Sequence, residues 1–224
     1  MENNKDCQFD DIEHTIKIYG VMMNAYRNEM DTCIQNWELY EEFQNNKDLI
    51  NSSLPKMTAI HSFNTIQYSL IQVTWLTLMK LWDDANKYND NVRLSLIYFF
   101  IKNKKFLNFI KEKYSEYPDI LEKYKNERNQ FKGLYETYTN GKLSKIYREL
   151  KRIRNEILAH SDMDSDLIYL HSEDELRDFY SNTVRMVELA YSLFNVHIEL
   201  TARQKIVRRN ARSFVAVLAK VVAP

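Results

Sequence analysis

The pattern that decides the fold lies in residues 12–40, IEHTIKIYGVMMNAYRNEMDTCIQNWELY. Apolar and aromatic residues recur in it at alternating steps of four and three: Ile12, Ile16, Tyr19, Met23, Tyr26, Met30, Cys33, Trp37 and Tyr40. This heptad spacing is typical of a helix that lies along another helix. Asp10 and Glu13 form an Asp variant of the capping box in front of it. We therefore expect a first helix from roughly residue 11 to residue 44.

The composition of the chain predicts an all-α protein. Its 224 residues include only three Gly and three Pro, which leaves few residues for the many turns of a β protein. The length fits one domain with a core of its own. The formal net charge is zero, so any attraction to nucleic acid must come from local patches.

The sequence also predicts a cytoplasmic protein. Cys7 and Cys33 have neither a metal-ligand nor a CxxC spacing, which indicates a reducing compartment. No N-terminal apolar segment resembles a signal peptide. The most apolar run, residues 66–82, is interrupted by six polar residues, so we interpret it as a buried helix and not as a membrane span. We expect no metal site, no cofactor and no membrane contact.

A second helix is expected over residues 57–83, after a polar loop that contains Pro55. It is apolar on nearly every side, as is typical of a helix at the centre of a bundle. It closes on Trp82, Asp83 and Asp84. The two carboxylates could face an active site, although acidic residues also commonly end a helix before an Asn-rich loop.

The middle of the chain predicts a short apolar helix over residues 92–101 and then a helical hairpin over residues 103–137. The hairpin is rich in Lys, Glu and Tyr and breaks at Tyr117-Pro118, where Pro suits the start of a helix. We expect it to attach to the bundle through its apolar side chains, which are Phe106, Phe109, Ile110, Ile120, Leu121, Tyr124, Phe131 and Leu134.

The charge balance of the chain reverses around the stretch Arg154-Asn155-Glu156-Ile157-Leu158-Ala159-His160-Ser161-Asp162. Residues 142–154 carry six bases and one acid, whereas residues 161–178 carry seven acids and one base. The helix that leads into the stretch has an apolar inner face of Leu143, Ile146, Leu150, Ile153 and Ile157. Its basic stripe could track an RNA backbone. That stripe consists of Lys145, Arg148 and Arg152, with Lys151 beside them.

Three residues of this stretch have the chemistry of phosphodiester cleavage. Arg154 offers a guanidinium fork for a phosphate, Asn155 an amide, and His160 an imidazole that transfers protons near neutral pH. In a regular helix Arg154 lies about 120° from His160, so the two converge only if the last turn distorts or a second subunit contributes. The competing interpretation is a helix C-terminus whose His contacts the last carbonyls and Asp162, while Arg154 pairs with a neighbouring acid.

The end of the chain predicts another long helix and then a tail. Ser172 and Glu175 form a capping box, and the seam that follows runs with helical spacing to His197 and Leu200. Residues 203–224 are basic and then apolar, and could form a tail or a helix. This segment could grip RNA, a membrane surface or a neighbouring subunit, or it could dock on the bundle or on its dimer mate.

The stretch from Arg154 to Asp162 resembles the Arg-x(4–6)-His signature of the HEPN superfamily, with a polar residue directly after the Arg. The Leu-Trp-Asp-Asp of residues 81–84 and the Leu-Ser-Leu of residues 94–96 are similar to the AbiU-like abortive-infection branch. The resemblance covers residues 10–200. It implies a HEPN-like helical bundle over residues 1–202, with the hairpin as an addition, which dimerises and sets two motifs across a cleft.

What the resemblance implies about function is a metal-independent endoribonuclease of a toxin–antitoxin or phage-defence system. Arg154 would bind the scissile phosphate, Asn155 would orient the substrate or His160, and His160 would be the general acid/base for attack by the 2′-hydroxyl. Superfamily toxins paired with a nucleotidyltransferase antitoxin often carry Tyr two residues after the His. Asp162 stands there, which argues against that mode of neutralisation. We hypothesise that Asp162 orients His160 and raises its pKa.

Two other functions stay open. The chain could be a non-catalytic HEPN module that binds RNA, a nucleotide or a partner protein such as an antitoxin through the same cleft. It could also be a purely structural dimer, which would be favoured if an internal salt bridge far from the other subunit occupied Arg154. The sequence names neither the RNA target nor the trigger.

Overall fold

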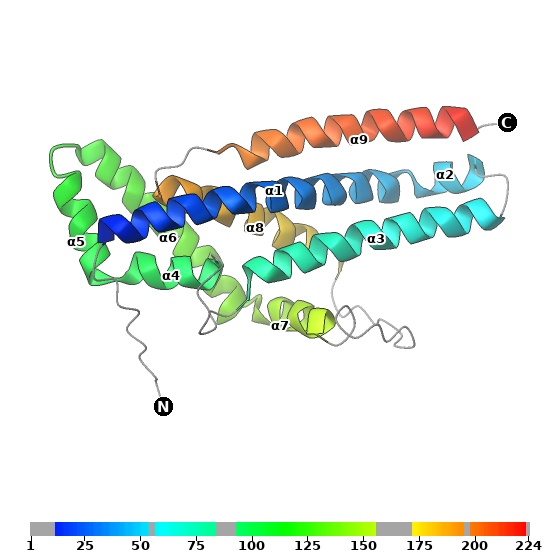
Figure 1. Ribbon diagram of the computed structural model, residues 1–224. Helices are drawn as coiled ribbons and strands as arrows, with labels where there is room; N and C mark the ends of the chain where they lie inside the picture. Colours follow the sequence, from blue (N-terminus) through cyan, green and yellow to red (C-terminus); the bar gives the residue numbers. More distant parts are fainter. Residues whose placement is uncertain (1–11, 54–56, 84–92, 156–171, 195–197, 223–224) are drawn as a thin grey trace.

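The computed structural model describes residues 12–53, 57–83, 93–155, 172–194 and 198–222 (Figure 1). Within these ranges the chain forms nine helices and no strand, which confirms the predicted all-α class. The helices are α1 (Ile12–Asn45), α2 (Lys47–Ser53), α3 (Met57–Leu81), α4 (Leu94–Lys102), α5 (Lys104–Lys113), α6 (Pro118–Thr139), α7 (Ser144–Ile153), α8 (Glu173–Leu193) and α9 (Leu200–Val222). None of them combines the length and the hydrophobicity that a membrane crossing requires.

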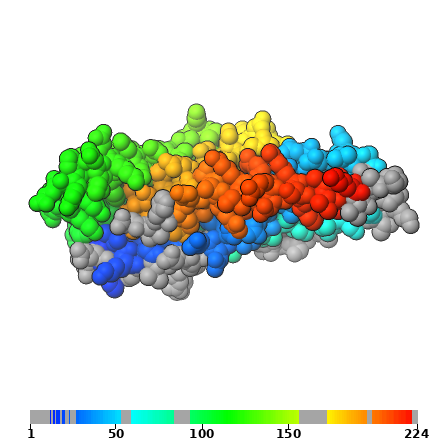
Figure 2. Space-filling model, turned by 90° about the horizontal axis from the view of Figure 1, so that it is seen from above, coloured from blue at the N-terminus to red at the C-terminus, as the bar shows by residue number. Residues whose placement is uncertain are grey.

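The long helices α1, α3 and α9 lie side by side and give the molecule an elongated shape (Figures 1 and 2). Helix α9 runs parallel to α1, and α3 runs antiparallel to it. The heptad residues Met30, Cys33 and Trp37 of α1 are buried between its neighbours. The heptad pattern therefore predicted correctly that α1 packs lengthwise on other helices.

Helices α6, α7 and α8 surround the indole ring of Trp82, which follows the last residue of α3. Trp82 is 2% exposed and its indole N–H donates to the Thr183 hydroxyl of α8 over 3.0 Å. Its ring lies close to the aromatic rings of Tyr135, Tyr138, Tyr147 and Phe179. Because these rings come from α6, α7 and α8, Trp82 fixes the end of α3 in the centre of the bundle.

The predicted helical pair in the middle of the chain forms as α5 and α6, and α6 begins at Pro118 as expected. Helix α6 packs against α8 and α7, and its Phe131 and Tyr138 are fully buried in the main core. The attachment predicted for Ile120 was wrong, because its side chain is 46% exposed in the first turn of α6. That α5 and α6 are an addition to the bundle stays a prediction.

The predicted start of α8 is confirmed, and its predicted end was wrong. The Ser172 hydroxyl accepts from the backbone N–H of Glu175 over 3.2 Å, and the Glu175 carboxylate accepts from the backbone N–H of Ser172 over 2.8 Å. The helix ends at Leu193 instead of near Leu200. A new helix, α9, begins at Leu200, so the expected boundary after residue 202 lies in its first turn; His197 lies outside the described residues.

The basic residues of α9 face acidic residues of α1. Three arginines of α9 form ion pairs with three carboxylates of α1, and these pairs are Arg203 with Asp31, Arg208 with Glu38, and Arg212 with Glu42. The hydrogen bond and the charge of Arg203 hold the pKa of Asp31 below its ordinary value. These pairs fix the register of α9 along α1.

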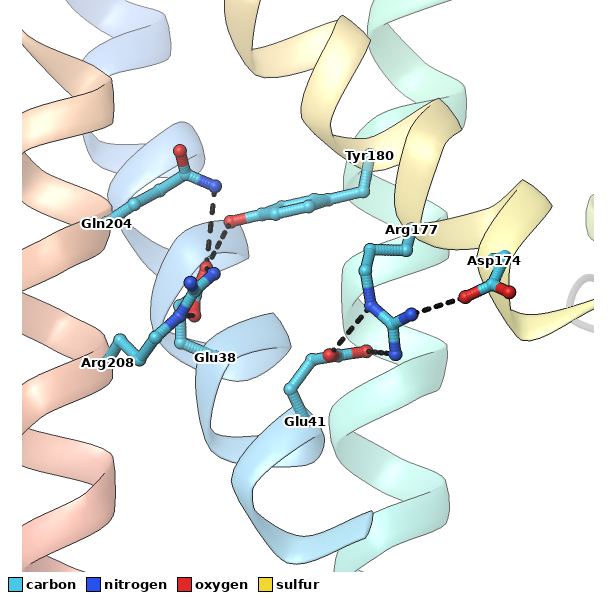
Figure 3. A network of polar contacts seen from close by, with 7 residues as sticks. All are labelled: Glu38, Glu41, Asp174, Arg177, Tyr180, Gln204 and Arg208. Carbon is cyan, nitrogen blue, oxygen red and sulfur yellow. Dashed lines mark hydrogen bonds and ion pairs between the residues drawn. The ribbon is translucent and has the colours of Figure 1, made fainter. Parts of the chain in front are cut away.

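The central pair of the three, Arg208 with Glu38, contains a buried carboxylate (Figure 3). Glu38 is completely buried and accepts hydrogen bonds from Arg208 Nε over 2.6 Å, from Gln204 over 3.4 Å and from the Tyr180 hydroxyl over 3.5 Å. Burial and the Glu38 charge raise the pKa of Tyr180, so its hydroxyl stays protonated and donates. One turn away, Arg177 of α8 binds Glu41 and Asp174. Helix α1 is thus tied to α8 as well as to α9.

Replacing Arg208 is expected to destabilise the fold more than replacing Arg203. In Arg208→Met the buried Glu38 loses its cation, which costs about 3 kcal/mol of unfolding free energy. In Arg203→Met the partner Asp31 remains partly solvated, so the loss is about 1 kcal/mol or less. Urea unfolding of the two variants measures the difference, and equal losses would contradict the role given to Glu38.

Candidate functional site

The signature arginine lies where the end of α7 meets the end of α3. Helix α7 is strongly amphipathic and buries Ile146, Leu150 and Ile153. Beyond it, residues 154 and 155 have π-helical character, whereas the backbone N–H of Arg154 keeps the α-type and 3₁₀-type bonds, to the carbonyls of Leu150 and Lys151. Such π turns are frequent at functional sites. The end of α7 is therefore irregular, but the turn from Arg154 to His160 lies outside the described residues, so the convergence of these two side chains stays a prediction.

The guanidinium of Arg154 forms an ion pair with Asp83, the residue that follows Trp82 at the end of α3. Its NH1 donates to Asp83 Oδ1, and its Nε donates to Asn155 Oδ1 over 2.9 Å. The side chains of Arg154 and Asp83 are 20% and 29% exposed. The structure thus brings together Arg154, Asn155 and Asp83, three of the predicted site residues, although Asp83 is 71 residues away in the chain.

Two hydroxyl groups that sequence reasoning missed hold the end of α3. The Tyr147 hydroxyl of α7 donates to the backbone carbonyl of Trp82 over 2.9 Å, and the Ser95 hydroxyl of α4 donates to the carbonyl of Asp83 over 3.1 Å. Tyr147 precedes Arg154 by seven residues, so both lie on one face of α7. That spacing is the signal that could have singled out Tyr147.

The predicted RNA-binding residues divide between two faces of α7. Lys145 and Arg148 are exposed, and Arg152 is paired with Glu149 at 2.6 Å. Lys151 is half-buried, and its Nζ lies 5.8 Å from the centre of the Tyr147 ring. Lys151 therefore lies on the same side of the helix as Arg154, whereas the other three cations point toward solvent.

The chain matches the AbiU2 family of HEPN proteins over residues 16–214. The protein belongs to the AbiU2 family. The match confirms the resemblance noted in the sequence, and it extends past residue 200 into most of α9. Nothing among the curated proteins and nothing among the solved structures matches the chain.

Three predicted site residues of this AbiU2 protein, Asp84, His160 and Asp162, lie outside the described residues. Their roles stay predictions. Within the described ranges, no group of three or more His, Cys, Asp or Glu side chains is arranged as metal ligands would be.

A surface groove of about 450 Å³ lies between α1 and α9, away from the Arg154 site. It is lined by Gln35, Leu39, Arg203, Val207, Asn210, Ala211 and Phe214. Its walls are mainly apolar, and its cation, Arg203, is already paired with Asp31. The groove does not have the chemistry of a phosphate site.

Arg154 is expected to contribute little to the stability of this AbiU2 protein. Its ion pair with Asp83 is partly solvated, so Arg154→Met should lower the unfolding free energy by about 1 kcal/mol or less. Trp82→Ala, which empties the buried site next to it, should cost about 3–5 kcal/mol. Denaturant unfolding compares the two. A loss of more than about 3 kcal/mol in Arg154→Met would favour a structural role for the arginine.

Proposed function

We propose that this AbiU2 protein is a metal-independent endoribonuclease that acts in abortive infection or in a toxin–antitoxin system. The observation that carries the proposal is Arg154, the arginine of a HEPN signature, whose fork is partly exposed beside cationic residues of α7. Membership of the AbiU2 family supports the same class of function. We further propose that the protein acts as a homodimer whose two motifs face each other.

In the proposed reaction, Arg154 binds the scissile phosphate and stabilises the charge of the pentacoordinate phosphorane. A guanidinium suits this role because it stays protonated and presents several donors in a fixed plane. Asn155 accepts from Nε of Arg154, which restricts rotation of the guanidinium. Preorganised donors of this kind commonly contribute the largest part of the stabilisation of a charged transition state.

His160 is proposed to move the protons. It removes the proton of the ribose 2′-hydroxyl as that oxygen attacks phosphorus, and the bond to the 5′-oxygen breaks. An imidazole then protonates the leaving 5′-oxygen, so the products are a 2′,3′-cyclic phosphate and a 5′-hydroxyl. In a homodimer, the second proton transfer can come from the partner copy. Asp162 is proposed to orient the imidazole.

The exposed cations of α7 are proposed to hold the rest of the RNA. Lys145 and Arg148 project into solvent on the outer face, where they can follow a phosphate backbone. Lys151 is closer to Arg154 and can bind the phosphate next to the scissile one. Because the protein as a whole has no net charge, these local cations must supply the attraction to RNA.

One observation favours a second function, a HEPN module that binds RNA, a nucleotide or a protein without cleaving it. The Arg154 guanidinium is already engaged by Asp83 of the same chain, as the competing structural interpretation of the sequence expected, so a phosphate must share it with a carboxylate. In such a module Arg154 and His160 would change ligand affinity only. An antitoxin or another defence protein would be a partner of either form.

The proposal predicts that the purified protein cleaves bacterial RNA or tRNA in the presence of EDTA. His160→Ala should lower the rate roughly 100- to 10,000-fold because the proton transfers are lost. Arg154→Ala should lower it roughly 100- to 1,000-fold because the phosphorane loses a donor. Gel analysis of end-labelled RNA measures the rates, and Arg209→Ala on the far helix α9 is a control that should cleave normally.

Two results would overturn this prediction. Equal cleavage by wild type and His160→Ala would remove the histidine from the reaction. No cleavage by the folded wild type, together with RNA binding that Arg154→Ala abolishes, would establish the binding module instead.

A further inference from the structure

The end of α3 is held more firmly than a helix end requires. The carbonyls of Trp82 and Asp83, the two residues that follow α3, accept from hydroxyl groups of two other helices. Tyr147 of α7 binds the carbonyl of Trp82 over 2.9 Å, and Ser95 of α4 binds the carbonyl of Asp83 over 3.1 Å. The Trp82 ring is itself buried, 5.3 Å between centroids from the ring of Tyr147.

These bonds fix the backbone of Asp83 relative to α7. Asp83 is partly exposed, and its carboxylate contacts Arg154, which directly follows α7. Tyr147 and Arg154 lie on one face of that segment, seven residues apart. The same stretch of chain therefore supplies Arg154 and anchors the anion that Arg154 contacts.

The ion pair leaves much of the guanidinium available for other acceptors. Among the described residues, Arg154 uses one N–H for Asp83 and one for Asn155, and a guanidinium has five. A long arginine side chain loses rotational freedom when it binds a ligand. An anion at a fixed place removes part of that freedom beforehand, which is preorganisation.

We infer that Asp83 is a positioning residue for Arg154, and that Tyr147 acts through Asp83 by clamping the end of α3. The inference rests on the proposed function, since it assigns these residues to the orientation of the phosphate-binding arginine. Asp83 holds NH1 and Asn155 holds Nε, which leaves the NH2 group and one N–H of NH1 as the donors for the scissile phosphate.

If Asp83 instead competes with the phosphate for Arg154, neutralising Asp83 should have the opposite effect on RNA binding. If Asp83 occupied the place of the phosphate, its neutralisation would free Arg154 and tighten RNA binding. If Asp83 positions Arg154, its neutralisation leaves the Arg154 guanidinium mobile and weakens the contact of Arg154 with the phosphorane in the transition state. Asp83→Asn keeps the shape of the side chain and therefore separates the two roles.

The test combines kinetics with a measurement that needs no activity. Asp83→Asn should lower kcat for RNA cleavage roughly 10- to 100-fold with little change in KM. Tyr147→Phe should lower it roughly tenfold, and the double variant should be no slower than Asp83→Asn because both act through one contact. In protein with ¹⁵N-labelled arginine, the Nη–H groups of Arg154, assigned with Arg154→Lys, should exchange with water at least about tenfold faster in both variants.

Two matched variants control for general damage. Tyr98→Phe removes a half-buried hydroxyl that donates to Glu136 over 2.6 Å, and Asp31→Asn neutralises the partner of Arg203. Neither should change cleavage or the Arg154 exchange rate. Tyr147→Phe should match Tyr98→Phe in its urea midpoint, so that a loss of activity is not a loss of folding.

The outcomes separate this inference from the proposed function. An unchanged Arg154 exchange rate in Asp83→Asn or Tyr147→Phe overturns the inference, whether or not the wild type cleaves RNA. A lower KM in Asp83→Asn overturns it in favour of competition with phosphate. If the wild type does not cleave RNA but exchange is faster in both variants, the proposed nuclease activity is overturned, and the inference that Asp83 positions Arg154 stands.

Discussion

The buried carboxylate of Glu38 is the constraint on which the rest of the structure depends. A charge without solvent must be paired and hydrogen-bonded, and Glu38 meets this need with Arg208 of α9 and Tyr180 of α8. One turn after Tyr180, the Thr183 hydroxyl of α8 binds the indole of Trp82. The register that Glu38 imposes on α8 and α9 is thus passed to the end of α3, where Asp83 meets Arg154.

The candidate site combines segments that are far apart in the chain. Asp83 lies just after α3, Ser95 lies in the first turn of α4, Tyr147 belongs to α7, and Arg154 follows α7 directly. Rigid helices hold the contacts of these groups, whereas the cations on the outer face of α7 are solvated. Such a division suits a site in which one phosphate is gripped in a defined geometry and the remaining backbone is bound loosely by charge.

Local signals in the sequence predicted much of the fold, but they could not predict contacts between residues far apart in the chain. The heptads of α1, the Pro118 start of α6 and the Ser172 capping box each lie within one continuous stretch of chain. The end of α8 was missed because helical spacing continues past Leu193 without a break. The bonds from Tyr147 to the Trp82 carbonyl and from Arg208 to Glu38 join residues 65 and 170 apart, and no periodicity encodes such pairs. The signature itself identified Arg154, but its contact with Asp83 required the fold.

The most direct test of the central claim is cleavage of two synthetic RNAs that span a mapped cleavage site. One is all-ribose, and the other carries a single 2′-deoxy nucleotide on the 5′ side of the scissile phosphate. We predict that, with EDTA present, the first is cut to a 2′,3′-cyclic phosphate and the second stays intact at that position. Equal cleavage of both RNAs would contradict attack by the 2′-hydroxyl, and with it the roles given to Arg154 and His160.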